Sequence, residues 1–131
     1  MQLTCPLEAT GQKVVSPTGH QMVLRAFDGS PRLTVRYCTL RALGGDTVSP
    51  WDAEDCLYYF QDCTLEAGVD FYYPHSWAYA ENCRFGCHNP NAAIWHDGPG
   101  NRDAKTVLKN CTFTGDDSFK LGRFPARHSF T

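Results

Sequence analysis

Long hydrophobic runs are missing from this sequence, and so is any concentration of charge of one sign. A membrane-spanning helix needs a run of about 18 apolar residues, and no such run is present. The formal net charge is −2, with acidic and basic residues mixed along the chain. Phosphate binding needs a concentrated basic face, and none is present. The composition therefore argues against a membrane protein and against nucleic acid as a partner.

Helical periodicity is missing as well. No segment repeats its apolar residues with a helical period over ten or more residues. Short β-rich runs alternate instead with turns rich in Gly, Asn and Asp. The hydrophobic content of 42% is sufficient for a packed core, and 131 residues suit one domain. We therefore expect an all-β fold in which residues 1–131 form a single domain or a fragment of one.

The cysteines indicate an internal repeat rather than a disulfide framework. There are seven, an odd number, and their spacings are wide. Cys38, Cys63, Cys83 and Cys111 recur in the similar contexts RYCTL, QDCTL, ENCRF and KNCTF, at sequence steps of 25, 20 and 28. In a repeat of this length, free cysteines stack inward as small hydrophobic residues, so we predict a buried thiol ladder. The pattern assigns no role to Cys5, Cys56 and Cys87.

A second series of positions has almost the same spacing. Asp70 lies in the strand-like run Val69–Tyr73, where an acidic residue is unfavourable. The sequence step from Gln21 to Asp46 is 25, and the step from Asp46 to Asp70 is 24. If one coil of chain is about that long, these side chains form a row on neighbouring strands, about 4.8 Å apart. The two series predict a right-handed parallel β-helix, a solenoid of about five rungs, with a β-sandwich as the alternative.

Four motifs in this order resemble the pectin methylesterase family, carbohydrate esterases built on a right-handed parallel β-helix. QMVLR at residues 21–25 resembles the family's QAVALR strand, and GDT at 45–47 stands where the family has Gln-Asp-Thr. GVDF at 68–71, followed by ENC at 81–83, resembles the GTVDFIFG…NC block, and LGR at 121–123 resembles LGRPW. The match runs over most of this chain but covers only the central part of a typical family member.

The resemblance implies a two-carboxylate esterase that acts on methyl-esterified galacturonan. In the family, the residue matching Asp70 attacks the ester carbonyl, and the residue matching Asp46 protonates methanol and later activates water. The residue matching Gln21 helps to hold the oxyanion, and the one matching Arg123 fixes the nucleophile. Elementary electrostatics agrees, because two neighbouring carboxylates hold one proton more tightly and an arginine keeps the other ionised.

The resemblance also implies the partner and the location. The expected partner is pectin or a related plant cell-wall polysaccharide, and the expected location is secreted or periplasmic, although the chain itself lacks a signal-peptide pattern. No cofactor and no metal is expected. The candidate substrate-binding residues, which could pack against sugar faces, are Tyr72, Tyr73, Trp77 and Trp95.

Other functions remain open at this point. A β-helix segment that binds sugars or only builds structure is favoured by two departures from the family pattern, Gly45 and Phe124. A β-helix polysaccharide hydrolase with paired carboxylates is suggested by the GDD sequence at residues 115–117, although such a sequence also forms turns. Zinc ligands of the right type occur at residues 87–88 and 96–97, but their spacing matches no familiar site.

The ends of the predicted solenoid carry an expectation of their own. The sequence begins within about one strand of Gln21 and stops eight residues after Arg123. Uncapped rungs expose backbone hydrogen-bonding groups. We therefore expect the chain either to be part of a longer protein or to pair its ends with a partner, which includes end-to-end self-association.

Overall fold

The computed structural model describes residues 2–10, 23–25, 32–42, 47–49, 57–68, 77–88, 92–95 and 105–123. The described elements are all strands, which confirms the all-β prediction for this part of the chain. They are β1 (Gln2–Thr10), β2 (Leu24–Arg25), β3 (Arg32–Arg41), β4 (Val48–Ser49), β5 (Leu57–Gln61), β6 (Thr64–Ala67), β7 (Trp77–Glu81), β8 (Arg84–Cys87), β9 (Ala92–Trp95), β10 (Thr106–Lys109), β11 (Thr112–Gly115) and β12 (Lys120–Arg123). Within the described residues there is no helix of a length and hydropathy that would cross a membrane.

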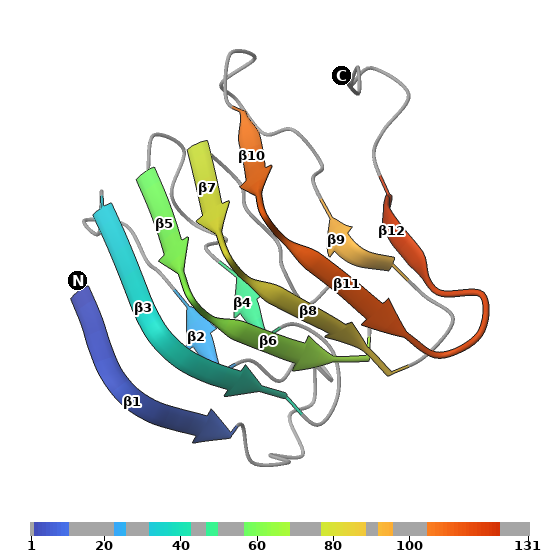
Figure 1. The fold of residues 1–131 in the computed structure, drawn as a ribbon, viewed down its shortest axis with the longest axis horizontal. Helices are drawn as coiled ribbons and strands as arrows, with labels where there is room; N and C mark the ends of the chain where they lie inside the picture. Colours follow the sequence, from blue (N-terminus) through green and yellow to red (C-terminus); the bar gives the residue numbers. More distant parts are fainter. Residues whose placement is uncertain are drawn as a thin grey trace.

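The main sheet has eight strands, and every pairing in it is parallel (Figure 1). Strand β3 pairs with β1 on one side and, on the other, with β5 through its first part and with β6 through its second part. Strands β7 and β10 continue the row from β5, and β8 and β11 continue it from β6. We call the row of β3, β5, β7 and β10 the first half-sheet, and the row of β3, β6, β8 and β11 the second half-sheet.

The strands of the two half-sheets pair at the same sequence offsets. The offset from β3 is 25 for both of its partners, since Arg32 lies opposite Leu57 in β5 and Thr39 opposite Thr64 in β6. The next pairings have an offset of 20 in both half-sheets, and the last have an offset of 28. These are the spacings of the cysteine contexts, so the internal repeat predicted from sequence is confirmed as stacked parallel strand pairs.

A bend separates the half-sheets, and one residue in each repeat makes it. Tyr37, Asp62, Asn82 and Asn110 have φ values of 55°, 53°, 54° and 51°, which lie in the left-handed region. Each directly precedes the cysteine of its repeat. The β-rich run around Cys63 is therefore two strands, β5 and β6, rather than one. Asn and Asp adopt the left-handed region at low cost, which explains three of the four residues.

The bend also shifts the phase of the inward-facing side chains. In the second repeat Tyr58 and Phe60 are buried before the bend, whereas Cys63 and Leu65 are buried after it, so one extra residue faces outward. The outward bend residues hydrogen-bond along the stack: Asn110 Nδ2 donates to Asn82 Oδ1 at 3.3 Å, and Asn82 Nδ2 donates to Asp62 Oδ1 at 3.2 Å. This ladder holds successive bends in line.

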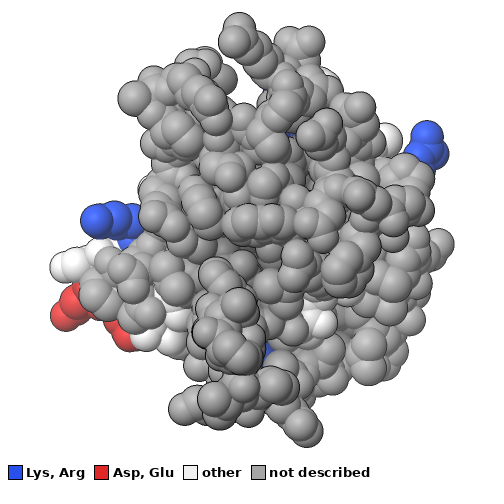
Figure 2. All heavy atoms as spheres, turned by 180° about the vertical axis from the view of Figure 1, so that it is seen from behind, with Lys and Arg blue, Asp and Glu red and all other residues white. Residues whose placement is uncertain are grey.

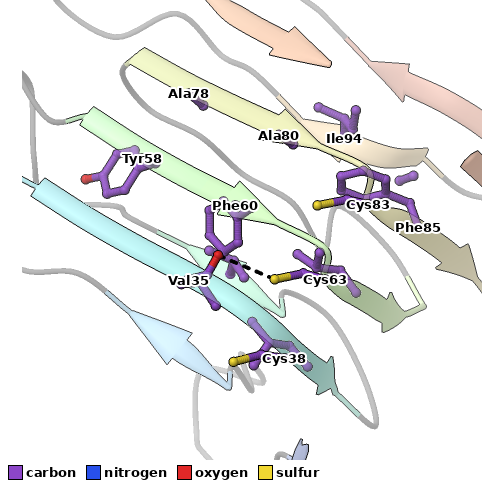
Figure 3. Close-up of a cluster of buried hydrophobic side chains, with 14 of the residues drawn as sticks. Val35, Cys38, Tyr58, Phe60, Cys63, Ala78, Ala80, Cys83, Phe85 and Ile94 are labelled. Atoms are coloured by element: carbon purple, nitrogen blue, oxygen red, sulfur yellow. Dashed lines mark hydrogen bonds between the residues drawn. The ribbon is translucent and has the colours of Figure 1, made fainter. Parts of the chain in front are cut away.

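The core lies between the curled main sheet and the short strands behind it (Figure 3). Aromatic residues Tyr58, Phe60 and Phe85 fill its centre, and Ile94 of β9 reaches it from the other side. Small residues of β7, Ala78 and Ala80, lie beside the rings and leave room for them. Side chains alternate between the two faces along each strand, and the inward-facing ones of both half-sheets pack into a single shared core.

The predicted thiol ladder is confirmed for Cys38, Cys63 and Cys83, which are buried beside one another in the core (Figure 3). The Cys63 Sγ donates to the carbonyl oxygen of Val35 at 3.5 Å. Cys111 continues the ladder but is only half-buried. Cys63, Cys83 and Cys111 are free thiols, as expected for cysteines that act as small hydrophobic residues.

Candidate functional site

Two of the four predicted catalytic residues are flanked by strands that pair side by side. Gln21 and Asp46 themselves lie outside the described residues, as do Asp70, Tyr72 and Tyr73. Strand β2 follows Gln21 and strand β4 follows Asp46, and the two strands are parallel with Leu24 opposite Val48. This offset of 24 equals the step from Asp46 to Asp70 and is one less than the step from Gln21 to Asp46.

Thr47 anchors the chain directly after Asp46. Its side chain is completely buried, and its Oγ1 donates to the carbonyl oxygen of Glu66 in β6 at 3.0 Å. Its own carbonyl oxygen accepts hydrogen bonds from the N–H groups of Val23 and Leu24, at 3.1 and 3.0 Å. One threonine therefore ties β2, β4 and the second half-sheet together next to the predicted acid.

The chain just before Val69 is also held. The His88 N–H donates to the carbonyl oxygen of Ala67 at 2.9 Å, and the Cys87 Sγ lies 3.6 Å from the carbonyl oxygen of Gly68. Cys87, to which the sequence pattern assigns no role, is fully buried here. The neighbouring repeat therefore fixes the backbone at the end of β6, where the GVDF motif begins.

Arg123 ends strand β12, which pairs in parallel with β9. The position opposite Arg123 in this register is Trp95, one of the predicted substrate-binding residues. These two strands therefore bring together one predicted catalytic position and one predicted binding position. Trp77 lies elsewhere, because its strand β7 belongs to the main sheet, between β5 and β10.

Trp77 lines a groove on the outward face of the first half-sheet. The groove has a volume of about 320 Å³ and is lined by Leu57, Tyr58, Tyr59, Trp77, Ala78, Tyr79, Lys105 and Val107. The rings of Tyr59 and Tyr79 lie on neighbouring strands with centroids 5.7 Å apart. Leu57 and Val107 are 48% and 45% exposed, so the apolar part of the groove is open to solvent.

Charged groups border this groove on its side nearest the bend. The Arg36 guanidinium carbon lies 5.4 Å from the centroid of the Tyr59 ring, a cation–π contact. Lys109 Nζ is 2.7 Å from Glu81 Oε1, and the Tyr59 hydroxyl donates to Glu81 Oε2 at 3.3 Å. The hydrogen bond from Lys109 lowers the pKa of Glu81, whereas burial and the nearby Glu81 raise the pKa of Tyr59. Glu81 is therefore anionic and Tyr59 protonated at neutral pH.

The outward face of the second half-sheet has a different chemistry. A groove of about 330 Å³ there is lined by Thr39, Arg41, Thr64, Glu66, Arg84, Gly86 and Thr114. Glu66 Oε2 lies 2.6 Å from Arg41 Nε and 3.6 Å from His88 Nε2, and the hydrogen bond from Arg41 lowers the pKa of Glu66. A Cβ atom at Gly86 would approach Glu66 Cγ to 3.0 Å, so the glycine makes room for this ion pair.

Of the two minor candidates from the sequence, the GDD turn is described, whereas residues 96–97 of the candidate zinc ligands lie outside the described residues. In the GDD sequence the Asp116 N–H donates to the Cys87 carbonyl oxygen at 3.0 Å, and the Phe119 N–H donates to the Asp116 carbonyl oxygen at 3.1 Å, as in a turn. Both aspartates are exposed. Across the described parts of the chain, no three His, Cys, Asp or Glu side chains are arranged to hold a metal ion.

The described charges do not form a broad patch of one sign on the far side of the molecule. Figure 2 shows that the coloured Lys, Arg, Asp and Glu atoms visible there lie mainly at the margins, with both signs present.

No family model, curated protein or solved structure matches this chain.

Sequence reasoning misses most of the aromatic groove. It names Trp77 as a candidate substrate-binding residue but assigns no role to Tyr59 and Tyr79. A usable signal is present, because the runs LYYFQ and WAYAE align along their whole length. In that alignment Leu57 meets Trp77 and Tyr59 meets Tyr79 on the outward face.

Proposed function

We propose that this chain is a pectinesterase-like carbohydrate esterase on a right-handed parallel β-helix of about five rungs. It hydrolyses methyl esters of galacturonan or a related cell-wall polysaccharide, in a secreted or periplasmic setting and without a cofactor. The proposal rests on the four motifs and on one structural observation. Strands β2 and β4, which continue from Gln21 and Asp46, pair in parallel with Leu24 opposite Val48, at an offset of 24.

That offset equals the step from Asp46 to Asp70, so it supports placing the two aspartates on neighbouring strands; it is one less than the step from Gln21 to Asp46, so the place of Gln21 rests on the motif alone. Parallel strands are about 4.8 Å apart, so groups that repeat with the pairing offset fall on neighbouring strands. The described backbone around the motifs is held by Thr47 and by the pairing of His88 with Ala67. A two-carboxylate mechanism needs such fixed spacing between its groups.

In the proposed mechanism Asp70 attacks the ester carbonyl while Asp46 supplies a proton to methanol. Water, activated by Asp46, then hydrolyses the acyl-enzyme and regenerates Asp70. Gln21 donates to the oxyanion without titrating, and Arg123 keeps Asp70 ionised. The products are methanol and a free uronate on the polysaccharide.

The test is methanol release from highly methylated pectin by the parent chain and by Asp70→Asn. Loss of the nucleophile should lower the rate by about a hundredfold or more. Asp117→Asn is the matched control, because Asp117 is an exposed turn residue and its variant removes the same charge. Equal rates for the parent and Asp70→Asn, or no release from either, would contradict the proposal.

A second candidate is a carbohydrate-binding β-helix without esterase activity. The observation that favours it is the aromatic groove on the first half-sheet, which lies on a different sheet from the motif strands β2 and β4. Gly45 and Phe124 also depart from the esterase pattern. Binding of pectin by a chain that releases no methanol would support this second candidate.

A further inference from the structure

We propose that the outward face of the first half-sheet is a binding site for an acidic polysaccharide, separate from the motif strands. The site is the aromatic groove with the residues that border it. Its centre is formed by Tyr59, Trp77 and Tyr79, and its open flanks by Leu57 and Val107. The groove volume of about 320 Å³ is within the range of small-ligand sites.

The strand pairing arranges this face in three rows that cross the strands. The pairing places Leu57 beside Trp77 in the first row, and Tyr59 between Thr34 and Tyr79 in the second. In the third row Gln61, Glu81 and Lys109 are neighbours. Two neighbouring rows that hold rings therefore lie beside one polar row, which suits the apolar faces and hydroxyl edges of a sugar chain.

The rings are presented in a fixed arrangement. Tyr59 is held by its hydrogen bond to Glu81 and by the Arg36 guanidinium over its ring. Tyr79 lies against Tyr59 with an interplanar angle of 39°. Tyr and Trp lose little conformational entropy on binding because they have only two side-chain torsions. A rigid set of partly exposed rings on a sheet face suits an extended ligand better than a compact one.

The charges around the rings favour an anionic ligand. The described outward positions of the first half-sheet carry four cations, Arg32, Arg36, Lys105 and Lys109, against one acid, Glu81. Lys105 lines the groove itself and is exposed. Lys109 is paired with Glu81 and Arg36 lies over the Tyr59 ring, so the exposed Lys105 supplies the charge that complements a uronate carboxylate. After the bend, the second half-sheet has no aromatic residue at its described outward positions Thr39, Arg41, Thr64, Glu66, Arg84, Gly86, Thr112 and Thr114, so the combination belongs to the first half-sheet.

The choice of polygalacturonate as probe rests on the proposed function, because free uronate chains are its product. The binding test itself is independent of that function. Polygalacturonate without methyl esters gives an esterase nothing to hydrolyse, and the measurement is made in the Asp70→Asn background. Failure of methanol release and failure of binding are therefore read separately.

The experiment measures the affinity of the full chain for polygalacturonate by calorimetry and by retardation in gels that contain the polysaccharide. We expect Trp77→Ala and Tyr79→Ala each to weaken binding by about tenfold or more. Lys105→Gln should weaken it less, and that loss should shrink as salt is raised. Arg84→Ala, at an outward position of the second half-sheet, is the matched control and should bind as the parent does.

Several outcomes would overturn the proposal. They are no measurable binding by the parent, unchanged binding by Trp77→Ala and Tyr79→Ala, or an equal loss with Arg84→Ala. Tighter binding to single-stranded DNA than to polygalacturonate would also overturn it, since stacked rings beside cations can hold bases. Trp77→Phe and Tyr79→Phe keep the rings, so retained binding in these variants separates loss of stacking from loss of folding.

Discussion

The two half-sheets share one core but differ on their outward faces. Inward positions on both sides of the bend carry buried aromatic, aliphatic and thiol side chains, such as Phe60 before it and Phe85 after it. Outward positions carry aromatic rings in the first half-sheet and threonines with an ion pair in the second. The inward side chains therefore determine the fold, whereas the outward side chains can differ in chemistry between the two half-sheets.

The largest effect is expected when one large core ring is removed from each half-sheet. Phe60 is completely buried, and Phe85 is 1% exposed and stacks on Phe113 with centroids 4.7 Å apart. We expect Phe60→Ala and Phe85→Ala each to lower the free energy of unfolding by about 3–5 kcal/mol, because each leaves a cavity in the same core. Chemical denaturation followed by circular dichroism measures both.

The corresponding leucine variants are the controls and should cost less, since they fill more of the space. Two losses of similar size mean that the half-sheets unfold together. A large loss for one phenylalanine and almost none for the other would show that the half-sheets do not share one core.

A smaller effect is expected at the bend that separates the half-sheets. Asn82 has a φ of 54°, donates to Asp62 and accepts from Asn110. Asn82→Ala should lower the free energy of unfolding by about 1–2 kcal/mol, because alanine is strained in the left-handed region and the ladder is interrupted. Thermal unfolding measures the difference.

Two further variants separate the causes. Asn82→Gly loses the ladder but accepts the backbone conformation, so it should cost less than Asn82→Ala. Tyr37→Asn is the reverse test, because Tyr37 has a φ of 55° with a bulky side chain, and the change should stabilise the chain by up to about 1 kcal/mol. Stabilisation by Asn82→Ala would rule out this account of the bend.

The smallest effect concerns the outward face of the second half-sheet. The hydrogen bond from Arg41 lowers the pKa of Glu66 from its ordinary value of 4.5. The ion pair therefore adds stability above about pH 4.5, and this contribution is lost as the pH falls through the lowered pKa of the folded state. Because Glu66 is partly exposed, we expect Glu66→Gln to cost less than about 1 kcal/mol at pH 7.

Unfolding measured between pH 7 and pH 3 checks this expectation. The difference between the parent and Glu66→Gln should disappear at the acidic end, whereas Asp117→Asn, an exposed turn variant, should change little at any pH. A cost for Glu66→Gln that grows as the pH falls would contradict the assigned sign.

The sequence predicts the repeat well and the bend poorly. Four similar contexts at steps of 25, 20 and 28 predict stacked parallel strands, and the pairing offsets have the same values. The bend is missed because the β-rich composition continues through each run, while a single left-handed residue such as Asp62 shifts the phase of the alternation. Tyr37 hides the pattern further, since its residue type does not favour that conformation.

The candidate site is predictable only as a set of spacings. The sequence steps between Gln21, Asp46 and Asp70 can be counted directly. The structure adds the pairing offset of 24 between Leu24 and Val48, with which those steps can be compared. The anchoring of Thr47 on the Glu66 carbonyl oxygen could not be foreseen, because it joins residues 19 positions apart in different strands. The register of β5 and β7 follows from the step of 20 between Cys63 and Cys83, but the groove also requires that Tyr59 and Tyr79 face outward, which only the structure shows.

The unequal offsets have a practical consequence for protein engineering. The pairing offset is 20 between β5 and β7 but 28 between β7 and β10, yet the bend residues Asn82 and Asn110 still meet. Strand lengths barely change between these stacked pairs, so the extra length falls between Cys87 and Thr106, a stretch that also contains β9. A scaffold that accommodates such a length change between two stacked strands is a suitable carrier for foreign peptides. Such peptides could be inserted there without changing the pairing of the strands on either side.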